Sequence, residues 1–200
     1  MGGAPTGVAS EAEYLSLALT SRQAAAQVRE RLNAALPDGI EVIDVTEREG
    51  ALGGKVSPQD RGDPGGSSPR DYEASQWRVV LPGVEPAAAQ RAVAGFLALG
   101  EAPVERLTDK GVRHLDARAA VVTLDVLGPA DPDDGLRAAV TGVQDCAILR
   151  MVVLHTAPAV RPDDVLTSLR EQYGLVPSSP PITTRLAQGS LALLAGVSVL

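Results

Sequence analysis

Apolar residues recur at helical spacing in three stretches of this 200-residue chain. The first predicts a helix between a cap at Thr20 or Ser21 and the Pro-Asp-Gly turn at 37–39. The other two, 86–100 and 162–174, each open at a proline and end at a glycine, as helices often do. The apolar stripes are Ala25, Val28, Leu32 and Leu36; Ala89, Val93, Phe96 and Leu97; and Val165, Leu169 and Tyr173.

Short apolar segments between these helices have the length and composition of β-strands. Two of them, 104–107 and 112–115, flank the turn Thr-Asp-Lys-Gly at 108–111 and predict a tight hairpin. The segment 146–155 is strongly apolar and predicts a buried strand. The remaining predicted strands are 13–19, 40–45, 75–81 and 119–127.

The order of these elements, with hairpins in place of regular crossovers, predicts an α+β fold of ferredoxin-like (split βαβ) units with antiparallel or mixed sheets. A stretch rich in Gly, Pro and Ser, 47–71, is expected to be a flexible linker because it cannot bury enough apolar surface to offset its ordering entropy. The expected domains are therefore an incomplete N-terminal αβ subdomain at 1–46, this linker, a second αβ subdomain at 72–184 and an apolar tail at 185–200.

Composition narrows the classes of function. The net charge of −7 disfavours a broad nucleic-acid surface, which needs clustered Lys and Arg to release counterions. The single cysteine, Cys146, excludes an internal disulfide and cannot by itself ligate an iron–sulfur cluster. We expect a cytoplasmic protein, because no secretory signal pattern is visible and the longest apolar stretch, 191–200, is too short to cross a bilayer.

Signatures of catalysis, cofactor binding and metal binding are missing from the sequence. It has no Gly-x-Ser-x-Gly elbow, and the glycine pairs at 53–54 and 65–66 neither precede a Lys-Ser/Thr step nor open a helix. His114 and His155 are far apart, and we interpret His155 as a hydrogen-bonded residue at a strand end. Cys146 lies in an apolar strand and is expected to pack, not to react. We therefore predict no catalytic, cofactor-binding or metal-ligating residue.

A polar cluster on the return arm of the predicted hairpin is the first candidate contact site. It consists of Lys110, Arg113, Asp116 and Arg118. Asp116 can pair with either arginine, and the cationic side chains can hold a phosphate or an acidic partner. The alternative is a hairpin that carries ordinary surface ion pairs.

The second candidate contact site is Glu11, Glu13 and Tyr14. In a strand, Glu11 and Glu13 would point to the same face, because side chains alternate with a period of two. Such a pair suits either a shared ligand or simple solvation.

Five short motifs occur in order along the chain. They are Pro-Thr-Gly-Val-Ala-Ser-Glu-Ala-Glu-Tyr-Leu at 5–15, Leu-Asn-Ala-Ala-Leu-Pro-Asp-Gly at 32–39, Trp-Arg-Val-Val-Leu-Pro-Gly at 77–83, Lys-x-x-Arg-x-x-Asp-x-Arg at 110–118 and Ile-Thr-Thr-Arg-Leu-Ala-Gln-Gly at 182–189. In this order and spacing they resemble the radical SAM-linked (radical SAM-associated) domain family, a bacterial family of unknown function. The resemblance spans nearly the whole chain.

This resemblance implies a partner, because members of that family are typically encoded beside, or fused to, a radical SAM enzyme with a cobalamin-binding region. It implies an iron–sulfur cluster, S-adenosylmethionine and cobalamin in the partner enzyme, and a role in modifying RNA or a ribosome-related target. The family pattern normally begins with a strand and a long helix that carry Ser-His and Arg-rich positions. The resemblance therefore implies an N-terminally truncated member.

Taken together, these features predict a non-catalytic accessory domain that works with a separate radical SAM enzyme. The first alternative is an RNA-binding or RNA-processing module of ferredoxin-like fold, since a sheet can present side chains to bases. The acidic balance and the scarcity of aromatic residues count against this alternative. The second alternative is a small-molecule enzyme that uses Glu11 and Glu13 as acid and base.

Overall fold

The chain forms two compact units, which we describe separately. The structure is a computed structural model that describes residues 4–5, 7–15, 17–47, 72–109, 111–128 and 146–194. One unit, called the sheet unit below, combines Met1–Glu13 with Pro69–Leu200. The other, called the small unit, is Tyr14–Ser68. Of the expected linker 47–71, only Glu47 lies within the described residues.

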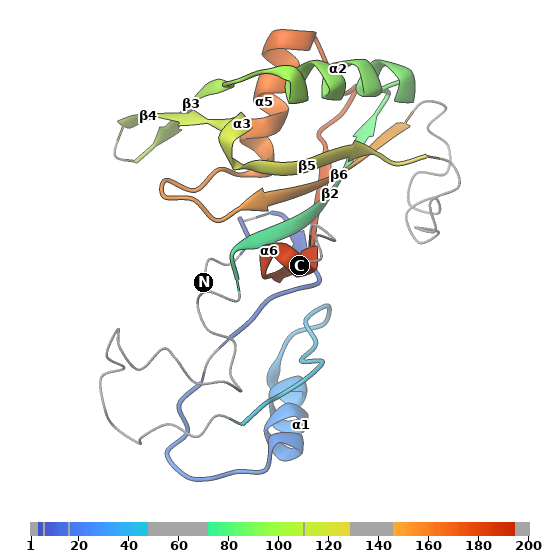
Figure 1. The fold of residues 1–200 in the computed structure, drawn as a ribbon. Helices are drawn as coiled ribbons and strands as arrows, with labels where there is room; N and C mark the ends of the chain where they lie inside the picture. Colours follow the sequence, from blue (N-terminus) through green and yellow to red (C-terminus); the bar gives the residue numbers. More distant parts are fainter. Residues whose placement is uncertain are drawn as a thin grey trace. The chain divides into compact units, whose positions relative to one another are not determined.

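Five strands of the sheet unit form a mixed sheet in the order β1-β7-β2-β6-β5 (Figure 1). Strand β2 is antiparallel to both β6 and β7, β5 is antiparallel to β6, and β1 is parallel to β7. This arrangement confirms the predicted α+β class with a mixed sheet. The strands are β1 (Ala9–Ser10), β2 (Ala74–Pro82), β5 (Val121–Val126), β6 (Cys146–Leu154) and β7 (Ile182–Gly189).

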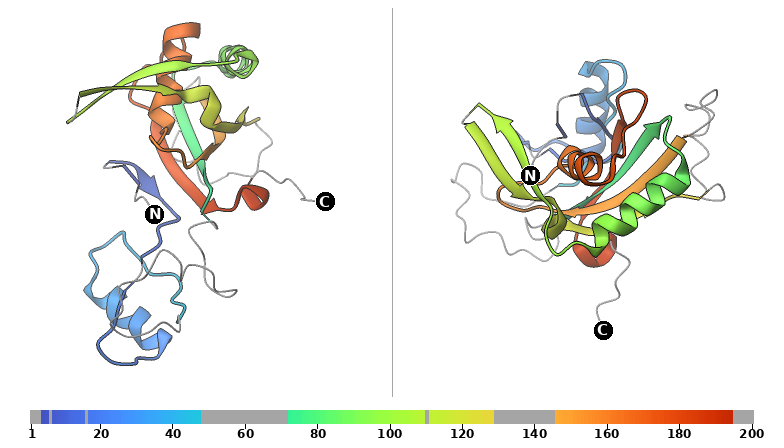
Figure 2. Two further views of the ribbon diagram at one scale, coloured as in Figure 1. Left: turned by 60° about the vertical axis from the view of Figure 1, so that its left-hand side comes forward. Right: turned by 90° about the horizontal axis from the view of Figure 1, so that it is seen from above.

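The helices α2 (Pro86–Ala98) and α5 (Pro162–Tyr173) lie together on one face of this sheet (Figure 2). With the strand order β7-β2-β6-β5, they form the split βαβ arrangement. The predicted strands 75–81 and 146–155 are confirmed. So are the predicted helices 86–100 and 162–174. Residue Gly174 ends α5 in the left-handed conformation, with φ of 65°, as expected for a C-terminal glycine.

The core lies between the helices and the sheet and is almost entirely aliphatic. Alternate residues of β2 and β6 point into it, as the two-residue period of a strand requires. Of the stripes predicted on α2 and α5, Tyr173 differs, because its side chain is exposed and its ring lies against Gly95 of α2. The buried core residues of these elements include Val79, Leu81, Ala89, Val93, Phe96, Leu149, Met151, Val165 and Leu169.

The predicted hairpin is confirmed as a separate two-stranded sheet between α2 and β5. Strands β3 (Pro103–Thr108) and β4 (Gly111–Asp116) are antiparallel, with Thr108 opposite Gly111 at the turn. The short helix α3 (Ala117–Ala120) follows directly and takes the first two residues of the predicted strand 119–127. Asp116 caps this helix, since its carboxylate accepts hydrogen bonds from the N–H groups of Arg118 and Ala119.

Two strand predictions at the N-terminal end are wrong. The segment 13–19 forms no strand in its described residues; the pairing occurs earlier, at Ala9–Ser10 against β7. The segment 40–45 forms no strand ladder. An apolar extended segment becomes a strand only when another strand pairs with it, and sequence pattern alone cannot supply that partner.

The C-terminal prediction also needs correction. Residues 185–189, expected to belong to an apolar tail, lie within β7, between β1 and β2. The polar side chains of Thr183, Thr184, Arg185 and Gln188 obscure the alternation that usually marks a strand. The helix α6 (Leu191–Leu194) follows β7.

The described part of the small unit contains one helix, α1 (Ala25–Ala35), to which the segment 40–45 is hydrogen-bonded. The helix starts after Ala24, which provides no side-chain cap, so the predicted cap at Thr20 or Ser21 is wrong. The side-chain amide of Asn33 donates to the carbonyl of Val42 and accepts from its N–H, at 3.1 and 2.6 Å. This reciprocal pair of bonds takes the place of a strand ladder along 40–45.

Candidate functional site

The most unusual region of the sheet unit is a group of buried polar side chains at one end of β2 and β7. Ser75 of β2 and Thr184, Arg185 and Gln188 of β7 are all buried. Buried polar groups are costly unless hydrogen-bonded or paired with an opposite charge, so each needs an explanation.

Arg185 is the most costly member, because its guanidinium is withdrawn from water. The guanidinium lies 4.9 Å from the centroid of the Trp77 ring, a cation–π arrangement. Its Nη1 is 3.5 Å from a carboxylate oxygen of Glu13. Burial lowers the pKa of Arg185, and the Glu13 carboxylate opposes this effect by stabilising the charged form. The Trp77 ring face and the Glu13 carboxylate therefore help to hold this buried cation in place.

His155 is held from both sides next to this group. Its Nδ1 is 2.7 Å from the carbonyl oxygen of Tyr72, so Nδ1 must carry the proton. Nε2 therefore accepts a hydrogen bond from the hydroxyl of Ser75, at 2.6 Å. Burial lowers the pKa of His155; the bond to the Tyr72 carbonyl opposes this shift, while the charge of Arg185 adds to it. The interpretation of His155 as a hydrogen-bonded strand-end residue is confirmed.

The N-terminal segment closes the open side of this group. The N–H of Glu11 donates to the carbonyl of Arg185 at 2.8 Å, which extends the pairing of β1 with β7. The amide of Gln188 donates to the carbonyl of Ala12. A carboxylate oxygen of Glu11 lies 3.7 Å from Nη2 of Arg78 on β2. The segment is thus attached by both main-chain and charged contacts.

The predicted site residues Glu11 and Glu13 therefore face two different arginines and do not form a carboxylate pair. Glu11 contacts Arg78 and Glu13 contacts Arg185. Both carboxylates are largely exposed, an arrangement that offers no support for an acid–base pair in a closed pocket. Tyr14, the third predicted residue, belongs to the small unit and is exposed.

In the predicted hairpin cluster, Asp116 and Arg118 form hydrogen bonds with backbone groups of their own unit. The Arg118 guanidinium donates to the carbonyls of Leu97 and Val121, and Asp116 also accepts a hydrogen bond from the N–H of Ala102. Arg113 is exposed on β4, opposite Arg106 of β3. Lys110 lies outside the described residues. A role in partner or anion contact therefore remains a prediction for these four residues.

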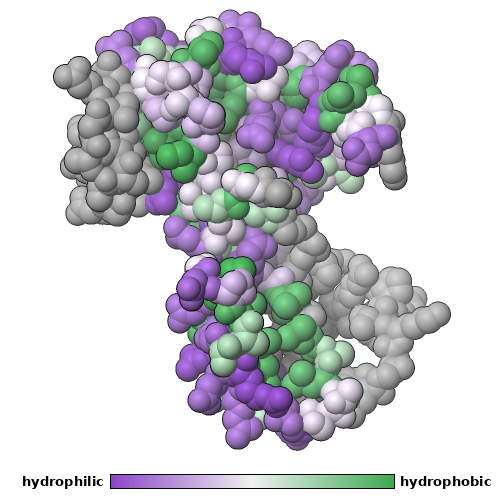
Figure 3. All heavy atoms as spheres, turned by 180° about the vertical axis from the view of Figure 1, so that it is seen from behind, coloured by the Kyte–Doolittle hydropathy of each residue, from purple (hydrophilic) through white to green (hydrophobic). Residues whose placement is uncertain are grey.

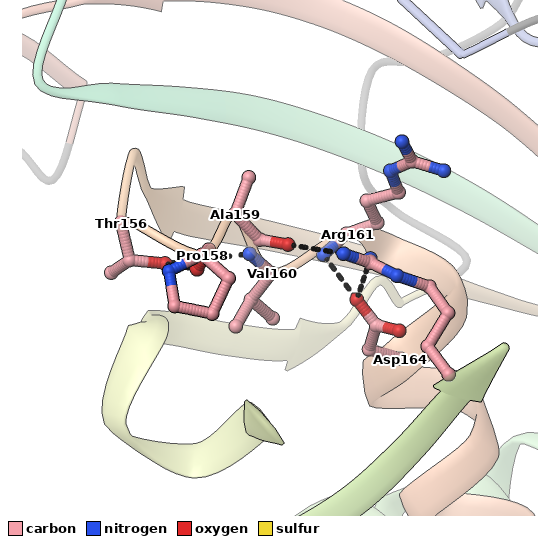
Figure 4. Close-up of polar contacts among 7 residues, drawn as sticks. Thr156, Pro158, Ala159, Val160, Arg161 and Asp164 are labelled. Atoms are coloured by element: carbon pink, nitrogen blue, oxygen red, sulfur yellow. Dashed lines mark hydrogen bonds and ion pairs between the residues drawn. The ribbon is translucent and has the colours of Figure 1, made fainter. Parts of the chain in front are cut away.

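A second buried charge lies where the hairpin meets α5 (Figure 4). The carboxylate of Asp164 accepts hydrogen bonds at 2.7 Å from Nη1 of Arg106 and from the N–H of Arg161. The other guanidinium nitrogen of Arg106 donates to the carbonyl of Ala159. Burial raises the pKa of Asp164, although the N–H of Arg161 and the charge of Arg106 favour the ionised form. This pair joins β3 to the start of α5.

A small pocket of about 200 Å³ opens beside this junction. Its polar lining comes from His114, Asp116 and Thr156. The Thr156 hydroxyl donates to the Pro158 carbonyl and accepts from the N–H of Val160, so it stabilises its own loop. The rest of the lining is apolar.

Two features of the chain bear on chemistry beyond these clusters. Burial raises the pKa of the Cys146 thiol, which keeps it protonated and supports the expectation that it packs and does not react. In the part of the chain that the structure describes, no group of three or more His, Cys, Asp or Glu side chains is placed to hold a metal ion.

No helix in the described residues has the length and apolar composition needed to cross a membrane.

The sequence analysis missed Arg78, Arg185 and Arg106 as members of polar sites. A usable signal was present for Arg78 alone, which is an arginine within the predicted strand 75–81. A long cation in a largely apolar strand usually needs a partner.

Substituting His155 by Gln should reduce the loss of stability in acid. The pKa of His155 is lower in the folded chain than in the unfolded chain, so its contribution to stability is present above the unfolded value of about 6.5 and is lost as the pH falls toward the folded value. Urea unfolding at a series of pH values should therefore show a steeper fall below neutral pH in the unmodified chain than in H155Q. The exposed His114 provides the control, H114Q, which should keep the steep fall. Equal slopes in all three would contradict the prediction.

Substituting Arg106 by Met should destabilise the chain by about 3 kcal/mol, because Asp164 would remain buried without its counter-ion. The matched control is R170M, since Arg170 forms an exposed ion pair with Glu171 and should cost no more than about 0.5 kcal/mol. The measurement is the free energy of urea unfolding at neutral pH. A loss for R106M no larger than that for R170M would show that the pair contributes nothing beyond a surface ion pair.

Comparison with known proteins places the chain in a family. A family model described as "Uncharacterized protein conserved in bacteria (DUF2344)" matches residues 1–162. No curated protein and no solved structure matches the chain. Because the match covers most of the sequence, the chain belongs to this conserved bacterial family.

Proposed function

We propose that the chain is an accessory domain that binds a separate radical SAM enzyme with a cobalamin-binding region and contributes no catalysis of its own. The resemblance of its motifs to the radical SAM-linked family suggests this partner. The iron–sulfur cluster, S-adenosylmethionine and cobalamin would all be held by the partner enzyme. A target in RNA or in a ribosome-related molecule would follow from the same resemblance.

The observation that carries the docking role is the apolar surface of the small unit. Its large aliphatic side chains are exposed, and α1 has no buried residue. Figure 3 shows apolar side chains gathered on the surface of this unit. An exposed apolar surface of this kind marks an interaction site more often than it marks a free surface. The exposed side chains are Leu15, Leu17, Leu19, Ile40 and Ile43.

The backbone of the same unit supports docking. Segment 40–45 forms no strand ladder and is held to α1 by side chains: Asn33 bonds the Val42 backbone, and Arg29 donates to the carbonyl of Ile43. These contacts leave the Ile40 and Ile43 side chains exposed. A partner could bury them without first breaking a sheet, so the cost of docking would be small.

Substituting Leu15 by Asp should weaken binding to the radical SAM enzyme, because it would place a charge in the apolar contact. We expect the dissociation constant to rise about ten-fold or more, measured by calorimetry with a reconstituted radical SAM/cobalamin enzyme from the same bacterium. The matched control is L107D on the hairpin, since Leu15 and Leu107 are both 81% exposed. Binding that is absent in the unmodified chain, or equal in L15D and L107D, would contradict the proposal.

RNA binding is a second candidate, favoured by one feature of the sheet. Arg78 and Arg150 are direct cross-strand neighbours on the face opposite α2 and α5. Like charges in this position repel unless compensated, and Glu11 on Arg78 and Asp125 opposite Arg150 provide partial compensation. Of the two, Arg150 is exposed, and an exposed arginine on a sheet suits a phosphate backbone, although the net charge of −7 limits such a surface.

If the sheet binds RNA, affinity for a structured RNA should fall steeply with salt, and R150A should reduce the slope of log K against log salt by about one. Fluorescence anisotropy over a salt series measures this slope. The control is R91A, which removes an exposed arginine from α2. A flat salt dependence in the unmodified chain would remove this candidate and leave the docking role.

A further inference from the structure

The outer edge of β7 is only partly paired. Strand β7 has eight residues, and in the described part of the chain β1 pairs with just two of them, Thr184 and Arg185. An edge strand with free N–H and C=O groups readily accepts an additional strand. The segment that follows β1 continues along this edge with one more main-chain bond, from Glu11 to the carbonyl of Arg185.

The two sides of the charged contacts differ in how firmly they are held. The side chains of Arg78 and Arg185 are 14% and 4% exposed, and Arg185 is fixed over the Trp77 ring. The side chains of Glu11 and Glu13 are 61% and 47% exposed. The cations therefore belong to the rigid sheet, whereas the carboxylates lie on a segment attached by a very short ladder. The carboxylate segment is the exchangeable component.

Gln188 adds a third contact point for a peptide. Its side-chain N–H donates to the carbonyl of Ala12, but its Oε1 is buried without a hydrogen-bond partner among the described atoms. The residue is 7% exposed, so water does not readily satisfy this acceptor. A main-chain N–H of an extended peptide can donate to this Oε1. An amide side chain can bond both the N–H and the C=O of a backbone at the same time.

We propose that the edge of β7 is a docking site for an extended acidic segment of a partner protein, and that residues 9–13 of this chain occupy it as a displaceable substitute. The partner segment runs parallel to β7, adds a strand by main-chain hydrogen bonds, and places two carboxylates on Arg78 and Arg185. Strand addition supplies affinity, and the two arginines supply selectivity for acidic residues. This site is on the sheet unit and does not depend on docking through the small unit.

The test uses the chain's own segment as the probe. A fluorescent synthetic peptide with the sequence of residues 4–15 is titrated with the full chain at neutral pH. The unmodified chain should bind it weakly, because the tethered segment competes at high effective concentration. The double variant Glu11→Gln/Glu13→Gln weakens the tethered segment and should bind the peptide about ten-fold more tightly or better. The matched control, Glu101→Gln/Glu105→Gln, removes two exposed carboxylates elsewhere and should bind like the unmodified chain.

A second measurement needs no further change in the protein. A peptide with Gln in place of both Glu residues should bind the E11Q/E13Q chain at least about ten-fold more weakly than the acidic peptide. Equal binding of the two peptides, or equal affinity of the unmodified and E11Q/E13Q chains for the acidic peptide, would overturn the proposal. Tighter binding of a short oligo(U) strand than of the acidic peptide would also overturn it and assign the two arginines to a nucleic acid.

Discussion

Burial of the Arg185 guanidinium is the constraint on which the arrangement of the sheet unit depends. A cation removed from water is unfavourable unless an opposite charge and a polarisable surface replace the lost hydration. Here the Trp77 ring supplies the surface and Glu13 supplies the charge. Because these groups come from β2 and from the N-terminal segment, satisfying one side chain brings the start and the late part of the chain to the same sheet edge. The pairing of β1 with β7 follows from this requirement.

The sheet consequently has two ends of different character. Where α2 and α5 cover it, the interior is aliphatic and close-packed, and its residues contribute stability through burial. At the other end, Ser75, Gln188 and His155 are linked by specific hydrogen bonds to neighbouring backbone or side chains. Directional bonds of this kind contribute little net stability, but they select one arrangement of groups. The polar end therefore fixes how its groups are arranged, while most of the stability comes from the aliphatic interior.

The small unit presents a different physical situation. An isolated helix of eleven residues is marginal in water, and most helices are stabilised by packing an apolar face. In α1 that packing is slight, because none of its residues is buried. The hydrogen bonds between Asn33 and the Val42 backbone help to hold segment 40–45 against the helix. Aliphatic side chains that a core would normally cover stay at the surface. A protein partner that covers them would stabilise the unit and gain affinity from the same contact, which links the physical state of this unit to the proposed accessory role.

Local signals in the sequence were enough to predict the helices α2 and α5, the strands β2 and β6, and the β3–β4 hairpin. Each has a strong local pattern, and both helices start at a proline, so the local preference and the final structure agree. They also predicted the α+β class and the hydrogen-bonded state of His155. They did not predict β7, because its buried polar residues are stabilised by Trp77 and by the N-terminal segment, which are far away in the sequence.

Tertiary structure alone decided which charges meet. Nothing in the spacing of the sequence connects the members of the charged pairs, since many residues separate them. Strand pairing brings Glu11 to Arg78 and Glu13 to Arg185. The contact of the hairpin with α5 brings Arg106 to Asp164. The sequence by itself determined where the chain could form helices and strands, because periodicity is a local property. The partners of its buried charges, and hence its candidate binding edge, depend on long-range pairing, which no local pattern records.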